Sequence, residues 1–199
     1  MTADSKIFKV YDVVLELVNK ESNPLKITIS EIADKCGIGK GTVYEYFKSK
    51  EDIFIKTFNY FITLVIKDIE SIEGDNFKGL FYAYYDQLVR MQKKCNAAFL
   101  TIMLGDSRFI PSIEIENGIK EILVPMKKCM ENFTKKLIIQ GISEGVLSEK
   151  LEIDNIYFAS MGIVSSIFAS NSPIGNDIYI DKKLASADSC YKCYVKLLN

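Results

Sequence analysis

Apolar residues recur every three or four positions along most of the chain, the spacing that places side chains on one face of an α-helix. The first such stripe runs over residues 5–20, and two more cover 51–72 and 77–95. Further helices are expected over residues 97–104, 114–142, 154–170 and 182–198. Because no segment alternates apolar and polar residues as a half-buried strand does, the pattern predicts an all-α fold.

One proline interrupts this pattern. Pro125 falls inside the stripe over residues 114–142. Proline inside a helix removes a backbone hydrogen bond and costs about 3 kcal/mol. A kink or a helix boundary near Leu123 is therefore expected.

Residues 28–53, TISEIADKCGIGKGTVYEYFKSKEDI, contain the clearest start and stop signals in the chain. Thr28 followed by Glu31 forms a capping box, which predicts the start of a helix. Gly37 predicts its end, because glycine readily adopts the left-handed conformation found at helix C-termini. The apolar face of this short helix carries Ile29, Ile32, Ala33 and Cys36.

A second short helix is expected after Gly39. Val43 and Phe47 are four residues apart and anchor one side of this helix to a core. The remaining side chains face elsewhere, namely those of Lys40, Gly41, Thr42, Tyr44 and Tyr46. Two short helices joined by a glycine-containing turn form a helix-turn-helix, whose second helix enters the major groove of DNA. Ser49 followed by Asp52 predicts the start of the next helix.

The run GIGKGTVYEYFKSKEDI resembles the DNA-binding signature of the TetR family of transcriptional regulators. In that family a turn glycine, a threonine, a Tyr-x-Tyr-Phe run and a Lys-x-Lys-Glu run recur at this spacing. The resemblance in motif covers about residues 6–60, and beyond it the length and the helical pattern agree. Two positions depart from the family: Gly39 replaces a usual Ser or Thr, and Glu45 places an acidic residue close to the expected DNA.

The resemblance implies a division of the chain into two domains. Residues 1–50 form a three-helix DNA-binding domain with its motif at 28–47, and a connecting helix leads into a larger helical effector-binding and dimerisation domain over 51–199. The residues expected at the DNA are Thr28, Ser30, Lys40, Gly41, Thr42, Tyr44, Tyr46, Lys48 and Lys50. Lys40, Gly41 and Thr42 are expected at the base edges, and Thr28, Tyr44, Tyr46 and Lys50 at phosphates. Ser30 is expected to add one contact, and Lys48 adds positive charge to the same face.

The second domain is rich in aromatic residues and methionine, and the resemblance implies an apolar effector pocket between its helices. The pocket candidates are Phe58, Phe61, Phe81, Tyr84, Tyr85, Met91, Phe99, Met103, Met126, Met130, Phe133 and Met161. An ordinary core is the alternative reading of each. The last two helices are the expected homodimer interface, with small residues Ala159, Ser160, Gly162, Ser165, Ser166 and Ala169. A homodimer suits a pseudo-palindromic operator.

Composition removes most other functions. The 199 residues include no histidine. This excludes catalysis by Ser-His-Asp or Cys-His groups and also excludes metal sites built on histidine. We therefore predict neither an enzyme nor a site for a metal or another cofactor. Net charge is −1, and residues 1–50 hold eight lysines against seven acidic residues, so a DNA-binding reading depends on the local placement of lysines. With no signal peptide or long apolar run, a cytoplasmic protein is expected.

Two alternatives to an effector-released repressor remain. Cys190 and Cys193 form a C-x-x-C pair in the last predicted helix, which would suit a thiol or redox sensor, although ordinary packing is the favoured interpretation because no second pair or histidine accompanies them. An effector-independent structural DNA-binding protein would keep the helix-turn-helix and fill the second domain with an ordinary core. The sequence specifies neither the base sequence of the operator nor the identity of the effector.

Overall fold

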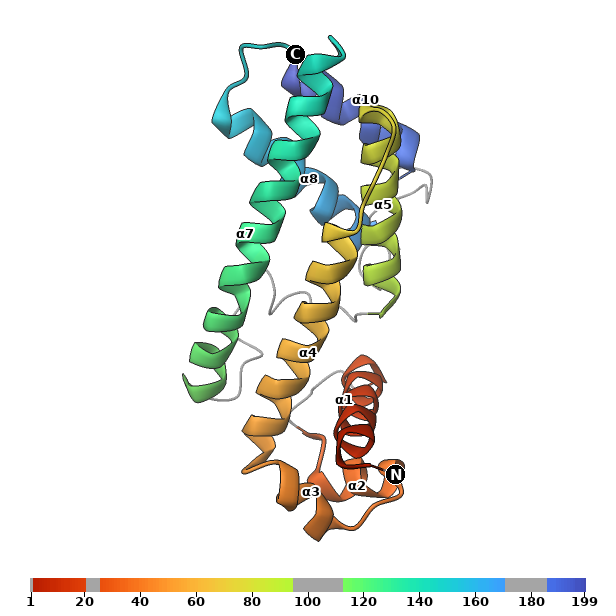
Figure 1. Ribbon diagram of the computed structural model, residues 1–199, viewed down its shortest axis with the longest axis vertical. Helices are drawn as coiled ribbons and strands as arrows, with labels where there is room; N and C mark the ends of the chain where they lie inside the picture. Colours follow the sequence, from red (N-terminus) through yellow and green to blue (C-terminus); the bar gives the residue numbers. More distant parts are fainter. Residues whose placement is uncertain (1, 21–25, 95–112, 171–185) are drawn as a thin grey trace. The chain divides into compact units, whose positions relative to one another are not determined.

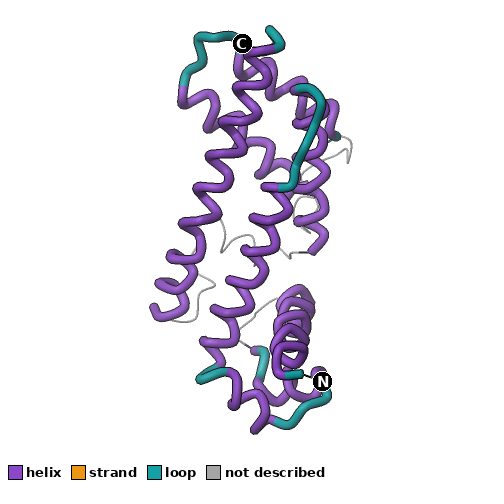
Figure 2. The backbone as a smooth tube through the Cα atoms, in the orientation of Figure 1, coloured by secondary structure: helices purple, strands orange, loops and turns teal. Residues whose placement is uncertain are grey.

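The computed structural model describes residues 2–20, 26–94, 113–170 and 186–199, and these form helices without any strand (Figure 1). Short loops join several of the helices (Figure 2). The all-α prediction is confirmed. The helices are α1 (Ala3–Lys20), α2 (Ile29–Cys36), α3 (Lys40–Tyr46), α4 (Lys50–Glu70), α5 (Phe77–Lys94), α7 (Ile113–Ser143), α8 (Ile153–Ser170) and α10 (Ala187–Leu198).

The chain forms two compact units. Unit 1 comprises residues 1–65 and 95–126, and unit 2 comprises 66–94 and 127–199, so that α4 and α7 each contribute to both. The functional division at residues 50 and 51 stays a prediction. None of the described helices combines the length and apolar character needed to cross a membrane.

The core of unit 1 holds the three N-terminal helices together. The apolar stripe of α1 is buried and packs on α2, as the periodicity predicted. Ile32 of α2 and Val43 of α3 are fully buried, and Ile53 at the start of α4 joins them. These helices are too short to be stable alone, so their position depends on this shared core.

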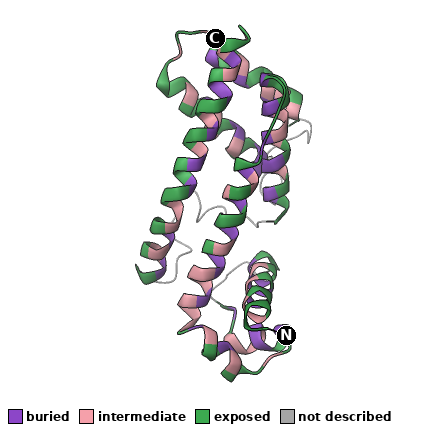
Figure 3. Ribbon diagram, viewed as in Figure 1, coloured by how far each residue is buried: buried purple, intermediate pink, exposed green. Residues whose placement is uncertain are grey.

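In unit 2, α5, α8 and α10 pack against one another. The buried side of α5 follows the expected helical spacing and appears as a purple stripe in Figure 3. The start of α5 is fixed by Glu144, whose two carboxylate oxygens accept hydrogen bonds from the Phe77 amide at 2.9 and 3.0 Å. This contact joins residues 67 positions apart and also places a negative charge at a helix N-terminus, where the helix dipole favours it.

Two helix boundaries differ from the sequence prediction. α7 runs from Ile113 to Ser143 through Pro125, so a helix boundary near Leu123 is wrong, whereas the kink stays a prediction. Ile119, Met126 and Cys129 continue one buried face on both sides of the proline. α10 begins at Ala187 rather than near residue 182, because the Ser186 hydroxyl caps it by accepting from the Ser189 amide at 3.2 Å. The predicted helix at 97–104 lies outside the described residues.

Candidate DNA-binding site

The first helix of the motif begins and ends where the sequence predicts. Thr28 is the N-cap of α2, and its hydroxyl accepts a hydrogen bond from the Glu31 amide at 3.2 Å. Gly37 ends the helix with φ 64° and ψ 35°, in the left-handed region that other residues rarely adopt. The Ile38 amide then donates to the Ala33 carbonyl at 3.1 Å, which closes the turn.

The second helix, α3, is held by two buried side chains. Gly39 is its N-cap, with extended backbone and no side chain to cap the helix. Val43 and Phe47 are 0% and 2% exposed, so one side of α3 is fixed to the core of unit 1. The Phe47 ring is also covered by the Lys56 ammonium group, which lies 5.3 Å from the ring centroid.

The junction between α3 and α4 is tied by Asp52. Its carboxylate accepts hydrogen bonds from the Lys48 amide and from Lys56 Nζ, both at 2.9 Å, while its own amide donates to the Ser49 hydroxyl at 3.1 Å. Burial acts to raise the pKa of Asp52, but the hydrogen bonds and the charges of the two lysines outweigh it and lower the pKa below its ordinary value. Lys56 Nζ also reaches the Tyr46 carbonyl at 3.4 Å. The sequence motif predicted that Ser49 and Asp52 begin a helix. It did not predict that Lys56 contacts both Asp52 and the Tyr46 carbonyl.

Most of the residues expected at the DNA lie on the outside of unit 1. The Tyr44 side chain is 54% exposed, so it is not a core residue of unit 1. Lys50 lies over the Phe54 ring, 5.7 Å from its centroid. The exposed members of the set are Thr28, Lys40, Gly41, Tyr44 and Lys48, and the half-buried ones are Ser30, Thr42, Tyr46 and Lys50.

Gly41 has open space around it. A Cβ built at this position meets no atom within 4 Å, so the fold of the chain does not itself require glycine there. Lys40 and Thr42 flank it on α3. Gly41 therefore leaves the helix backbone uncovered between the Lys40 and Thr42 side chains, and DNA could approach the backbone closely at this point.

The expected effector-pocket residues separate into three groups. Phe81, Tyr84, Met91 and Phe133 are buried in unit 2, with Tyr85, Met130 and Met161 half-buried there. Phe58, Phe61 and Met126 are buried in unit 1, and Phe99 and Met103 lie outside the described residues. Three of the unit 2 candidates form one cluster, in which the Tyr84 ring lies 4.7 Å from the Phe133 ring and its hydroxyl 4.0 Å from the Met130 sulfur.

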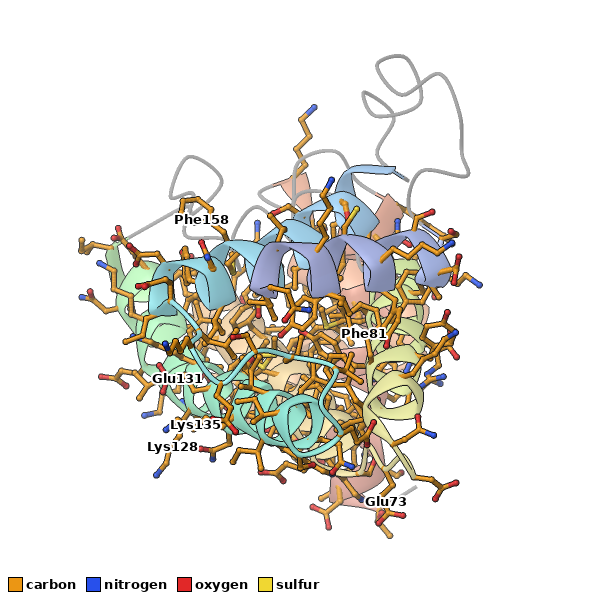
Figure 4. All side chains as sticks on the ribbon, turned by 90° about the horizontal axis from the view of Figure 1, so that it is seen from above. Glu73, Phe81, Lys128, Glu131, Lys135 and Phe158 are labelled. Carbon is orange, nitrogen blue, oxygen red and sulfur yellow. The ribbon has the colours of Figure 1, made fainter. Side chains whose placement is uncertain are left out.

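Unit 2 also has cavities that the sequence pattern did not indicate. One of about 170 Å³ is lined by Ile69, Glu70, Cys129, Asn132, Phe133 and Lys136. A more polar one of about 500 Å³ is bordered by Asp68, Ser71, Ile72, Glu73, Ala83, Gln87 and Arg90. Figure 4 shows Phe81 in the interior, whereas Lys128, Glu131 and Lys135 project outward from α7.

The C-x-x-C pair is not joined by a disulfide in this structure. Cys190 is buried and Cys193 is exposed, and both thiols are free. Burial raises the pKa of the Cys190 thiol, which opposes the thiolate form needed for reactivity. Within the described ranges, no group of Cys, Asp and Glu residues is arranged to hold a metal ion.

Comparison with known proteins places the motif in a family. Residues 23–57 match the family described as bacterial regulatory proteins, tetR family. A fatty acid metabolism regulator protein of Bacillus subtilis (strain 168) is 29% identical over 154 residues, 74% of each chain. The HTH-type transcriptional regulator YerO of the same strain is 44% identical over 48 residues, which cover 24% of this chain and 17% of that protein.

Solved structures share the fold over nearly the whole length. The transcriptional regulator FadR from Bacillus subtilis, in complex with stearoyl-CoA, matches with a TM-score of 0.63 and 22% identity over 96% of this chain and 97% of its own. A TetR transcription regulator from Haloarcula marismortui matches with a TM-score of 0.68 and 15% identity over 98% and 97%. These relatives are regulators of transcription, not enzymes. The match over residues 23–57 confirms the resemblance of the helix-turn-helix to the tetR family of bacterial regulatory proteins, and the solved structures share the fold of the whole chain.

Proposed function

We propose that the protein is a homodimeric repressor that binds an operator through α3 and releases it when an acyl compound binds in unit 2. The observation that carries the DNA-binding part is the outer face of α3. The buried Val43 and Phe47 fix the inner face of that helix to the core. On its other face Lys40 and Gly41 are exposed and Thr42 is half-buried. A recognition helix needs this combination, because it must be rigid on one side and accessible on the other.

Each residue of that outer face has a role in this proposal. Lys40 donates to guanine O6 or N7, the Thr42 methyl contacts a thymine methyl, and Gly41 permits close approach of the backbone. Tyr44, Tyr46, Lys48 and Lys50, together with Thr28 and Ser30, bind phosphates and fix the register without reading sequence.

Homodimerisation is supported by apolar side chains on the outside of α8 and α10. Ile153, Tyr157 and Phe158 of α8 are 80%, 63% and 68% exposed, and Leu197 of α10 is 52% exposed. Figure 4 shows the two helices side by side with Phe158 on α8. Large apolar side chains gathered on one surface indicate an interface. Gly162, Ser165 and Ser166, also exposed on α8, would let a second copy approach closely.

An acyl effector is supported by the relatives. The 29% identical protein is named a fatty acid metabolism regulator, and the FadR structure contains stearoyl-CoA. The interior of unit 2 offers apolar and aromatic side chains of the kind that line such pockets, including Phe81, Tyr84 and Phe133. The effector releases DNA only if it binds the DNA-free conformation more tightly than the DNA-bound one.

The DNA-binding role is tested by fluorescence anisotropy with duplexes taken from upstream of the protein's own gene. The wild-type protein is expected to bind one duplex far more tightly than the rest, with affinity that falls as salt rises. A Lys40→Ala, Thr42→Ala variant should lose the preference for that duplex. Weak binding to every duplex, unchanged in the variant, would rule out α3 as the recognition helix.

A further inference from the structure

The C-terminal end of α3 is held by a side chain that comes from α4. The ammonium group of Lys56 donates hydrogen bonds to the Asp52 carboxylate at 2.9 Å and to the Tyr46 carbonyl at 3.4 Å. The same group lies 5.3 Å from the centroid of the Phe47 ring. One side chain therefore contacts the last residue of α3, its C-cap and the first turn of α4.

The Tyr46 carbonyl gives this contact a specific role. The last four carbonyl groups of a helix have no partner inside the helix, and they form the negative end of its dipole. A lysine ammonium satisfies such a carbonyl and carries the charge that the dipole favours at that end. Lys56 is thus a C-terminal cap for α3 that is supplied by the next helix.

The orientation of α3 depends on few contacts. The helix is seven residues long, and Gly39 at its N-cap has no side chain to cap it. Val43 is buried within the helix, and Phe47 is buried directly after it. A helix this short is not stable alone. The contacts at its C-terminal end therefore decide the angle at which it lies on the core.

The Phe47 ring is in contact with two other helices. Tyr11 of α1 lies edge-on to the ring, with 5.9 Å between the centroids, and Lys56 of α4 makes a cation–π contact with it. The Lys56 side chain is 43% exposed, and ion pairs at that exposure contribute little to global stability. Lys56 is therefore expected to contribute more to the orientation of α3 than to the free energy of unfolding.

Orientation matters most for contacts with base edges, because hydrogen bonds weaken steeply away from their preferred angle. In the proposed function, Lys40 and Thr42 in the first turn of α3 contact bases, and Lys48 contacts a phosphate. Lys48 lies beyond α3, where its amide donates to the Asp52 carboxylate at 2.9 Å. A tilt of α3 about Val43 would displace Lys40 and Thr42 and leave Lys48 in place.

We propose that Lys56 is a positioning residue for sequence recognition, which holds α3 at the angle that base contacts require and does not itself touch DNA. The inference rests on the proposed function and deepens it, because it assigns a specificity-determining residue to the same DNA-binding site. Lys56 acts through the Tyr46 carbonyl and the Phe47 ring.

The test compares binding of Lys56→Met to the operator and to a non-operator duplex by fluorescence anisotropy. Methionine keeps an unbranched apolar side chain and removes the ammonium group. Affinity for the operator should fall about tenfold, because base contacts are lost. Affinity for the non-operator duplex at low salt, which depends on phosphate contacts, should stay at the wild-type value.

Two other lysine substitutions separate positioning from charge. Lys35→Met removes a cation of similar exposure from α2, where Lys35 lies 3.5 Å from the Glu16 carboxylate. It should bind both duplexes like the wild type. Lys48→Met removes a proposed phosphate contact, so it should weaken binding to both duplexes and reduce the slope of log affinity against log salt by about 1.

Two results of these titrations would overturn the inference. If Lys56→Met loses affinity for both duplexes and its salt slope falls as in Lys48→Met, Lys56 binds a phosphate directly. If its unfolding midpoint falls while its preference for the operator equals that of the wild type, Lys56 only stabilises unit 1.

Hydrogen exchange without DNA checks the same contact. The Phe47 amide donates to the Val43 carbonyl at 3.0 Å, at the end of α3 that Lys56 holds. In Lys56→Met this amide should exchange about tenfold faster. The Ile32 amide of α2, which donates to the Thr28 carbonyl at 3.1 Å, should exchange as in the wild type. Unchanged exchange at Phe47, or equal acceleration at both amides, would contradict the inference.

The two proposals fail in different ways. If the wild-type protein prefers no duplex, the proposed DNA-binding function fails, and hydrogen exchange still shows whether Lys56 holds the end of α3. If the wild type prefers an operator and Lys56→Met has the same preference, the inference fails alone.

Discussion

At Gly41 the proposed contact with DNA and the stability of α3 can be separated experimentally. It lies in a helix, where glycine is unfavourable, yet no neighbouring atom lies within 4 Å of the place where a Cβ would stand. The chain therefore gains nothing in its own packing from the absence of a side chain. The benefit that remains is the approach of another molecule to the outer face of α3.

Gly41→Ala should therefore separate the two properties. We expect the free energy of unfolding to rise by about 0.5 kcal/mol, because alanine favours the helix. Affinity for the operator should fall by about tenfold, because a methyl group meets the DNA. Urea unfolding and fluorescence anisotropy measure the two effects.

Gly79→Ala on α5 is the matched control. A Cβ there would lie 3.4 Å from the Asn76 side-chain oxygen, which is an ordinary contact, so this change should leave DNA binding unaltered. Unchanged operator affinity in Gly41→Ala would remove Gly41 from the DNA interface.

At the scale of elements, the sequence predicted the starts of α2 and α4 well because caps are local. Thr28 with Glu31 and Ser49 with Asp52 lie three residues apart, so their spacing alone specifies the hydrogen bond. The Glu144 contact with the Phe77 amide joins two helices 67 residues apart, and no local pattern specifies such a partner. Periodicity indicates which face of a helix is buried but not which helix covers it.

The same limit explains the pocket prediction. Tyr84, Met130 and Phe133 lie in one cluster, but an aromatic or methionine stripe looks the same whether it lines a pocket or fills a core.

The α3 to α4 junction should depend on pH through Asp52. Because the folded pKa of Asp52 lies below its ordinary value of 3.8, its contribution to stability is full above that value and is lost as the pH falls through the lowered pKa. Asp52→Ala should lower the free energy of unfolding by about 1 kcal/mol at pH 7, as for a lost cap, and by much less near pH 2.

Urea unfolding of both proteins at several pH values measures this difference. Lys127 and Glu131 supply the comparison, because their pair on α7 is exposed, with 3.9 Å between the Lys127 ammonium and the Glu131 carboxylate, and Glu131→Ala should change stability little at any pH. A constant difference between wild type and Asp52→Ala across the whole pH range would show that the carboxylate charge has no part in the junction.

For the whole molecule, the proposed dimerisation is the property on which operator binding depends. A single α3 reads one half-site, and two copies about 34 Å apart are needed to bind successive major grooves. The exposed apolar side chains of α8 and α10 are the candidates for holding the copies together, and none of them lies in the helix-turn-helix.

Phe158→Glu should weaken the dimer by about 100-fold, because like charges meet across a two-fold axis. Operator affinity should fall in parallel while the helical content stays unchanged. Sedimentation velocity measures the oligomeric state.

Ile139→Glu on α7 is the matched control, since Ile139 is 67% exposed and Phe158 is 68% exposed. It should leave the dimer intact. Equal sedimentation of wild type and Phe158→Glu would place the interface elsewhere.

The most direct test of the account is a titration of stearoyl-CoA into the complex of the wild-type protein with its labelled operator, followed by anisotropy. Anisotropy is expected to fall to the value of the free duplex as stearoyl-CoA is added, whereas free CoA should have no such effect. Anisotropy that stays constant at stearoyl-CoA concentrations that saturate the protein would contradict an effector-released repressor.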